Sequence, residues 1–301
     1  MKRILLLTTA LVFCFAGTSH AKLKIVTTTT DSADLARQIG GDKVEVYSVM
    51  KGPENVHNVM ATPPEMVKLN QADMFVHSGL DTEPWRDNLL RGARNPRVAP
   101  GKPGNVDMST GIELKEVPVD GRGDRAQGDM HAYGNPHYTL SPLNAQRMTA
   151  TLVKAMIAVD KANADFYVAN AKKLVNELAD TAKWMREQTA SMGELKVVTF
   201  HRAWPYFAEA AGIKIVGTIE PKPGITPSAA QVVQLVRLMK EQGVKVVIVE
   251  TYNDQKLAAR VAEAAGAKLL RLPDHVNGVP EASSYQALFR YNVEKIVEAA
   301  K

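Results

Sequence analysis

Cysteine is almost absent from this chain: the only one among 301 residues is Cys14, inside the apolar N-terminal segment. It follows the bulky Phe13 rather than a small residue, which does not favour a lipid-modified cysteine. If residues 1–21 are removed, no thiol remains for a disulfide, a thiolate ligand or a cysteine nucleophile. Any metal site would then have to use histidine and carboxylate side chains.

Long apolar runs are also scarce. The run Ile4 to Gly17 is shorter than the ~20 residues that a bilayer-spanning helix needs. Lys2 and Arg3 precede it, and Ser19-His20-Ala21 follows as a small-x-small cleavage pattern. We therefore expect residues 1–21 to be a cleaved signal peptide and the mature protein to be exported to the periplasm.

Clustered positive charge is a third absence. The formal charge is +5, and because Lys2 and Arg3 contribute two of it, residues 22–301 carry +3. No run of five or more basic residues occurs in that range. Nucleic acid is therefore not an expected partner.

Alternating short apolar strands and longer helical patterns predict an α/β fold with two lobes, each a small parallel sheet flanked by helices. About 280 mature residues exceed the ~100 to 200 usual for one domain. Strands are expected at 24–28, 44–49, 74–77, 195–200, 213–218, 244–250 and 268–272. Helices are expected at 32–39, 64–71, 85–90, 203–211, 227–242, 255–265 and 285–300.

One long rigid helix should join the lobes. Leu143 to Met192 contains neither Gly nor Pro, which favours helix almost throughout. A break near Asp160-Lys161 would leave a final helix of roughly 30 residues, ~45 Å long. The predicted divisions are an N-terminal lobe at 22–142, a helical segment at 143–192 and a C-terminal lobe at 193–301.

A stretch rich in Gly, Asp and Arg, Lys102 to Gly134, shows little apolar periodicity. It is expected to be surface loop with one edge strand at most, and its centre, Asp120 to Met130, is expected to be mobile.

Six histidines remain after the signal peptide, and three of them lie in loops or directly after a predicted strand. These are His57, His137 and His201. Open parallel sheets place ligand sites at the carboxyl ends of their strands. Taken singly, each of these residues is better explained as a surface or hydrogen-bonded histidine than as a metal ligand.

Four motifs, in order along the chain, resemble those of one protein family. They are Gly52 to His57 followed by Thr62-Pro63-Pro64-Glu65, then Gly79 to Trp85, then Asn135-Pro136-His137 to Pro142, and finally Thr199-Phe200-His201 to Phe207. Together they resemble the zinc and manganese substrate-binding proteins of ABC importers, the cluster A-I metal receptors, over essentially the whole mature chain.

The resemblance implies that His57, His137 and His201 are metal ligands. Three imidazole nitrogens favour Zn²⁺ over Mn²⁺, whose sites use more oxygen. The fourth ligand is usually an aspartate in a Leu-Asp-Pro pattern, whereas this chain has Leu272-Pro273-Asp274-His275. Because this proline precedes the acid, Asp274 is shifted by one residue, and His275, Glu250 or water remain alternatives.

Other residues are candidates for supporting roles. His131 lies in the Gly-rich loop and could transiently collect metal, although a plain loop histidine is the simpler interpretation. Glu220 could orient a ligand histidine, and Trp204 and Tyr206 could form an apolar shell around the site or be plain core.

The expected function is therefore passive capture of Zn²⁺ between the lobes and delivery to an ABC-type permease. The protein is expected to be a monomer and not an enzyme. A manganese receptor of the same family is the alternative. A second alternative is a periplasmic zinc hydrolase with Glu250 or Glu220 as the general base. The sequence has neither the His-Glu-x-x-His motif nor the Gly-x-Ser-x-Gly motif that would support it. A receptor for an organic solute would explain two lobes but not three histidines.

Overall fold

The structure is a computed structural model that describes residues 21–118, 131, 133–222 and 224–301. The expected signal peptide lies outside this range except for Ala21, and so does the loop centre Asp120 to Met130. Within the described ranges, no helix combines the length and the apolarity that crossing a membrane requires.

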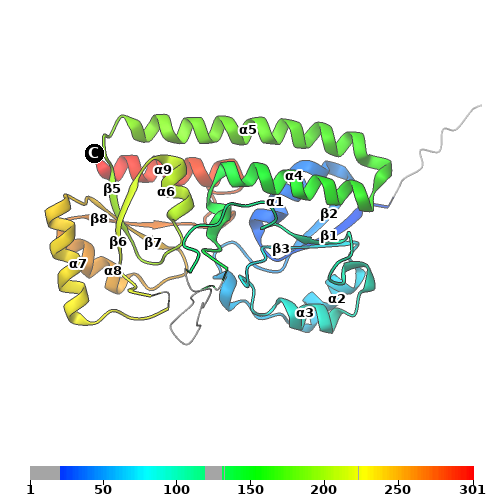
Figure 1. Cartoon of the computed structure of the whole chain (residues 1–301), viewed down its shortest axis with the longest axis horizontal. Coiled ribbons are helices and arrows are strands. Elements are labelled where there is room, and N and C mark those ends of the chain that lie inside the picture. The colour runs from blue at the N-terminus through cyan, green and yellow to red at the C-terminus, as the bar shows by residue number, and fades with distance from the viewer. Residues whose placement is uncertain (1–20, 119–130, 132, 223) are drawn as a thin grey trace, which may run out of the picture.

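The N-terminal half is built on a four-stranded parallel sheet with strand order β2-β1-β3-β4 (Figure 1). Its strands are β1 (Leu23–Thr27), β2 (Val44–Ser48), β3 (Met74–His77) and the edge strand β4 (Asn105–Asp107). Its helices are α1 (Thr30–Gly40), α2 (Pro63–Gln71) and α3 (Arg86–Ala93). All four residues of β3 are buried, as expected of a central parallel strand.

The C-terminal half repeats this strand order as β6-β5-β7-β8, again all parallel. Its strands are β5 (Lys196–Thr199), β6 (Lys214–Thr218), β7 (Val246–Glu250) and β8 (Lys268–Leu272). Its helices are α6 (Pro205–Ala211), α7 (Ala229–Gln242), α8 (Gln255–Ala265) and α9 (Tyr285–Ala300). The predicted fold class is thus confirmed, with most element ends within two residues.

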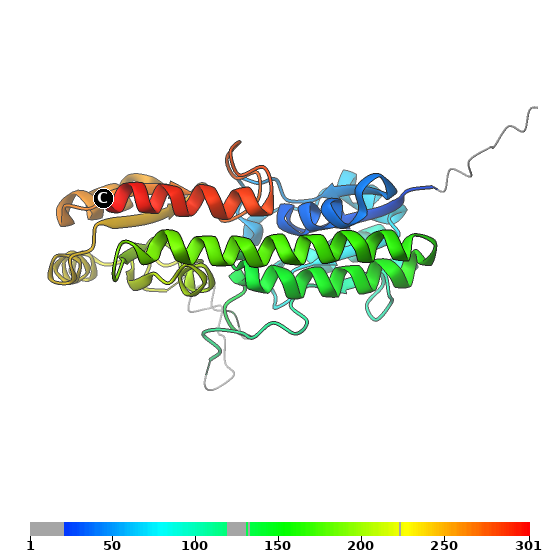
Figure 2. The same ribbon diagram turned by 90° about the horizontal axis from the view of Figure 1, so that it is seen from above.

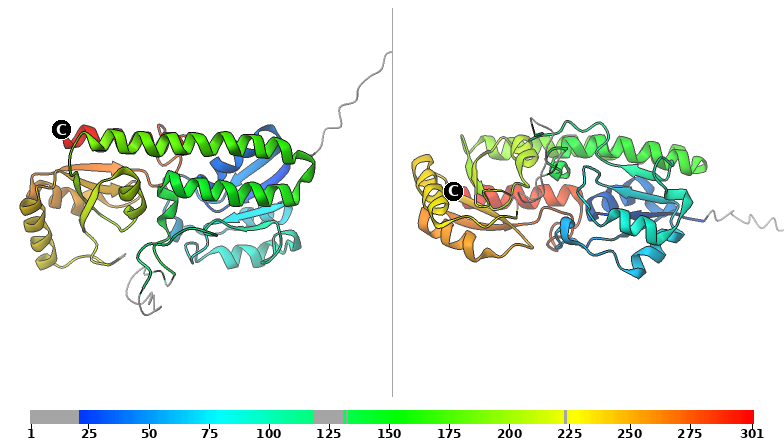
Figure 3. Two further views of the ribbon diagram at one scale, coloured as in Figure 1. Left: turned by 45° about the horizontal axis from the view of Figure 1, so that its top comes forward. Right: turned by 60° about the horizontal axis from the view of Figure 1, so that its bottom comes forward.

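Two consecutive helices connect the halves. α4 (Pro142–Val159) begins at Ser141, whose side chain accepts a hydrogen bond from the backbone N–H of Asn144, and Pro142 suits the first helical position. A short 3-10 turn forms the predicted break, and α5 (Ala164–Ala190) then runs for 27 residues, ~40 Å at ~1.5 Å per residue. α5 packs against α1 and α4 in one half and α6 and α9 in the other (Figures 2 and 3).

The main hydrophobic core is continuous across both halves. It contains residues such as Ile25 and Leu35 from the first half, Leu178 from α5, and Phe207 and Phe289 from the second. Two smaller clusters lie within single halves, one around Phe75 and one around Val247. Lobe boundaries at 22–142 and 193–301 stay a prediction, because helices and core are shared between the two sheets.

Candidate metal centre

Three histidines from distant parts of the chain converge between the two sheets. His57 lies in a 3-10 turn after β2, His137 begins the turn that precedes α4, and His201 lies two residues after β5. All three are buried, and one ring nitrogen from each lies within 4.8 Å of the others. Two nitrogens bound to a single tetrahedral Zn²⁺ at ~2.0 to 2.1 Å stand ~3.3 Å apart, so ring movements of about an ångström would bring all three onto one ion.

The Nδ1 atom of each ring is already engaged. Nδ1 of His57 lies 2.9 Å from the carbonyl oxygen of Thr82, and Nδ1 of His201 lies 2.8 Å from a carboxylate oxygen of Glu220. Nδ1 of His137 lies 3.0 Å from the side-chain oxygen of Asn135. Since these oxygens accept, each Nδ1 carries the proton and donates, which leaves Nε2 as the coordinating atom.

The free Nε2 atoms point to a ligand. Within the part of the chain that the structure describes, Nε2 of His57 and Nε2 of His137 are buried and have no hydrogen-bond partner. Buried polar atoms are nearly always satisfied, so two such acceptors beside a third imidazole need a cation or a donor from outside the chain. Neutral imidazoles with oriented Nδ1 protons are the form that binds a transition-metal ion.

The three imidazoles differ in their affinity for protons. Burial, together with the neighbouring His131 and His201, lowers the pKa of His57 to about 3. Burial and the neighbouring His201 hold the pKa of His137 well below its ordinary value. Burial also disfavours the charged form of His201, but the hydrogen bond to Glu220 and the charge of Glu250 outweigh it and raise the pKa of His201.

These differences predict the proton balance of metal binding. At about pH 6, below the ordinary imidazole value of ~6.5, His201 carries a proton that a metal ion must displace, whereas His57 and His137 are already neutral. Zinc binding should therefore release about one proton from the histidines, and affinity should fall as pH falls through the raised pKa of His201. Calorimetry in buffers of different ionisation enthalpy measures this number. Release of two or three protons would show that the other two rings are also protonated.

The candidates for the fourth position lie at the carboxyl ends of β7 and β8, at the same end of the sheet as His201: Glu250 is the last residue of β7, and Asp274 and His275 follow β8. Asp274 is 1% exposed; one of its oxygens accepts from the Tyr252 hydroxyl at 2.9 Å, and the other has no partner within the described chain. Burial raises the pKa of Asp274. Glu250 is fully buried, and its two oxygens accept from Trp204 Nε1 at 2.7 Å and Asn253 Nδ2 at 2.8 Å.

His275 is held from the opposite half of the molecule. Its Nδ1 lies 2.6 Å from a carboxylate oxygen of Asp31, and its Nε2 lies 3.8 Å from Asp274. Burial disfavours the charged imidazole, but the carboxylates of Asp31 and Asp274 outweigh burial and raise the pKa of His275 to about 9. His275 therefore differs from His57 and His137, whose pKa values are lowered, and is similar to His201 in that carboxylates stabilise its positive charge.

The predicted supporting residues have distinct places. His131 packs against His57 with ring centroids 5.0 Å apart, and its Nδ1 lies 3.1 Å from Asp81. Trp204 is completely buried and is a hydrogen-bond donor to Glu250. The Tyr206 hydroxyl donates to the carbonyl oxygen of Asn135 at 2.8 Å, so it supports the residue that orients His137.

Several contributors were not identified from the sequence. Thr82 acts through a backbone carbonyl, which no side-chain pattern reveals. Asn135 lies two residues before His137, a spacing that would have suggested a side-chain contact. Asp31 and Tyr252 lie far along the chain from the residues they contact, and no local signal indicates either contact. His77, the last residue of β3, lies apart from this group, and its Nε2 is 3.1 Å from the Asn105 side chain.

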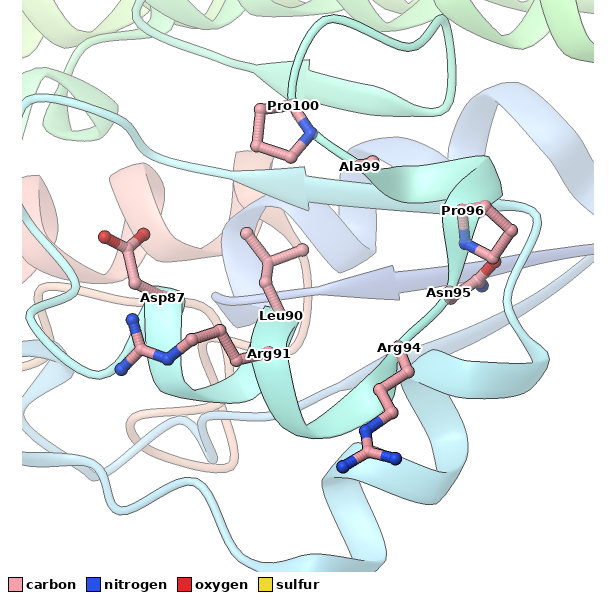
Figure 4. Close-up of a pocket in the computed structure, with 8 residues that line it drawn as sticks. All are labelled: Asp87, Leu90, Arg91, Arg94, Asn95, Pro96, Ala99 and Pro100. Atoms are coloured by element: carbon pink, nitrogen blue, oxygen red, sulfur yellow. The ribbon is translucent and has the colours of Figure 1, made fainter.

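A surface depression of about 670 Å³ lies elsewhere, on α3 and the segment that follows it (Figure 4). It is lined by Asp87, Leu90, Arg91, Arg94, Asn95, Pro96, Ala99 and Pro100. None of these is a predicted ligand. The aromatic residues Trp85, Trp204 and Tyr206 are all buried.

Comparison with known proteins gives this arrangement a context. The sequence profile of the family described as ZnuA, the periplasmic component A of the zinc-uptake complex, matches residues 25–299. The chain belongs to this family. It is therefore a metal-binding solute receptor of an ABC transporter that acts outside the cytoplasm, and its family consists of transport binding proteins rather than enzymes. An ABC-transporter permease is the partner that the family implies.

Individual relatives differ in the metal that their names give. The receptor is 28% identical to the high-affinity zinc uptake protein ZnuA of Bacillus subtilis, over 84% of this chain and 78% of that protein. It is 26% identical to the manganese ABC transporter substrate-binding lipoprotein PsaA of Streptococcus anginosus, over 96% of this chain and 94% of that protein. A crystal structure of a zinc-bound ZnuA deletion mutant superimposes with a TM-score of 0.79 at 25% identity, covering 93% of this chain and 98% of that one. These similarities establish a metal receptor without distinguishing zinc from manganese.

Proposed function

We propose that this receptor is a periplasmic, high-affinity zinc-binding protein that holds Zn²⁺ through His57, His137 and His201 and delivers it to an ABC-type permease. The observation that carries the proposal is the convergence of three imidazole rings whose Nδ1 atoms are each held by an oxygen. Capture requires no covalent chemistry. The ion is bound as cargo and must later be released.

The donor set favours zinc over manganese. Nitrogen donors bind Zn²⁺ more strongly than Mn²⁺ in the general affinity order of divalent metals, and manganese sites in proteins use more carboxylate oxygen. The nitrogen ligands proposed for this site are three imidazoles, and the oxygen candidates for the fourth position are Asp274 and Glu250. A manganese receptor of the same family is the alternative.

Asp274 is the proposed fourth ligand. Its second oxygen is buried without a partner, whereas both oxygens of Glu250 already accept hydrogen bonds. His275 also has an unpartnered Nε2, but the charge that Asp31 and Asp274 stabilise on its ring opposes metal binding. The remaining alternatives for the fourth ligand are a water molecule and His131, which would have to move toward the ion.

Titration calorimetry with Zn²⁺, Mn²⁺ and common small solutes tests the proposal. We expect zinc to bind tightly with one ion per chain, manganese to bind more weakly, and organic solutes to give no heat. Tighter binding of manganese than of zinc would show that the protein is a manganese receptor of the same family. Binding of a solute without any metal would overturn the proposed function.

A further inference from the structure

The segment that follows Asp274 is tied to the opposite half of the molecule. Both carboxylate oxygens of Asp31, on the first turn of α1, accept hydrogen bonds from it: His275 Nδ1 lies at 2.6 Å and the backbone N–H of Val276 at 2.8 Å. Asp31 is 1% exposed and His275 is 5% exposed. Figure 2 shows the segment before α9 beside α1. This contact is therefore a buried, charge-assisted joint between the two halves.

The loop that carries His57 packs against the same segment. An added Cβ at Gly52 would lie 2.1 Å from the backbone carbonyl carbon and oxygen of Asn277 and 2.6 Å from the backbone nitrogen of Gly278. No other residue type fits there without movement of the backbone, because the atoms in the way belong to the main chain. The loop bearing one proposed ligand is thus in direct contact with the loop bearing another.

Asp274 is therefore held from two sides. On its N-terminal side the anchors belong to its own half, because it follows β8 and the carbonyl oxygen of Pro273 accepts from Asn292 at 2.8 Å. On its C-terminal side the anchor is Asp31. One oxygen of Asp274 accepts from Tyr252, and the other has no partner among the described residues. The direction of that second oxygen depends on where the backbone of residues 274–276 is fixed.

We propose that Asp31 is a positioning residue of the metal site: by fixing His275 and Val276 across the interface, it places Asp274 relative to the three histidines. The inference rests on the proposed function. It implies that the fourth ligand moves with α1 and the His57 loop rather than with the C-terminal half alone. A displacement between the halves would then separate Asp274 from His201, while the contact between Asp31 and residues 275 and 276 is kept.

The test compares Asp31→Asn with Asp34→Asn, and each protein is titrated with Zn²⁺ by calorimetry and with Co²⁺ by visible absorption. Asp34 is a matched control, because it lies on the same helix and accepts a backbone hydrogen bond at 2.8 Å from Tyr285, away from Asp274. Loss of a residue that hydrogen-bonds a metal ligand directly typically weakens binding about 10- to 100-fold. Because Asp31 acts through residues 275 and 276, we expect a loss of about 10-fold and a changed Co²⁺ spectrum for Asp31→Asn, and neither for Asp34→Asn.

Gly52→Ala provides a second variant that leaves Asp31 intact but pushes the loop after Asp274. It should change the Co²⁺ spectrum as Asp31→Asn does. If Asp31→Asn does not fold, the Co²⁺ spectrum of Gly52→Ala alone tests whether the position of the loop after Asp274 affects the metal site. Wild-type spectra and zinc affinity in both variants, or equal changes in Asp34→Asn, would overturn the role of Asp31. Failure of the wild-type protein to bind zinc would instead overturn the proposed function.

Discussion

Replacing His137 with alanine should weaken zinc binding by more than about 100-fold, since loss of a partner outside the coordination shell alone typically costs about 10- to 100-fold. The substitution removes one of three nitrogens that lie within 4.8 Å of one another. The Asn135 side-chain oxygen that now holds the ring would lose this contact and keep only the hydrogen bond from the backbone N–H of residue 137. Competition with a chromogenic chelator measures the affinity of both proteins in the range where direct titration is too steep.

His77→Gln is the matched control for this substitution. His77 is also buried in the N-terminal half, but it contacts Asn105 and lies outside the convergent group. Its replacement should leave zinc affinity within about threefold of the wild-type value, which corresponds to less than ~1 kcal/mol. Equal losses in the two variants would mean that His137 acts through stability alone and is not a ligand.

Zinc at 1,000 times its dissociation constant should raise the free energy of unfolding by about 4.1 kcal/mol, provided that it binds only the folded protein. For a chain of this size that corresponds to an increase in Tm on the order of 10 °C. The gain arises because the unfolded chain cannot bring together ligands that stand 80 and 64 residues apart in sequence, from His57 to His137 and from His137 to His201. Thermal denaturation followed by circular dichroism, with and without zinc, provides the measurement.

The same experiment on His137→Ala separates specific from nonspecific effects. At an equal zinc concentration the variant should lose most of the stabilisation, because its dissociation constant is far higher. An unchanged Tm of the wild-type protein with saturating zinc would contradict selective binding to the folded state. So would an equal increase in the wild-type protein and the variant.

Most elements of the fold could be predicted because the local signals agree with one another. The Gly-free and Pro-free stretch after Leu143 is helical except near Asp160, and the apolar run at Val246–Glu250 is a fully buried strand. Element ends were harder to predict. β5 ends at Thr199 rather than Phe200, and α6 begins at Pro205 rather than Ala203, because Ala203 and Trp204 belong to the turn that follows His201.

The site was only partly predictable, for a physical reason. The resemblance to the motifs of a known family indicated the three histidines, and Glu220, a candidate partner, contacts His201 at 2.8 Å. The contact between Asp31 and His275 spans 244 residues, and no pattern near either one reveals it. The carbonyl of Thr82 is equally hidden, since every residue has one. Contacts of this kind depend on how the two sheets are placed, which only the assembled fold determines.

The shared core gives the receptor a mechanical property that two separate lobes would lack. Apolar side chains from β1, α5 and α9 belong to one cluster, so pulling the halves apart would expose the inner face of α5 to water. The described architecture therefore has no free hinge between the halves, because α5 and the shared core hold them in a fixed relative position. Opening the site to release a bound ion would cost free energy, and binding to the permease that the family implies could supply it.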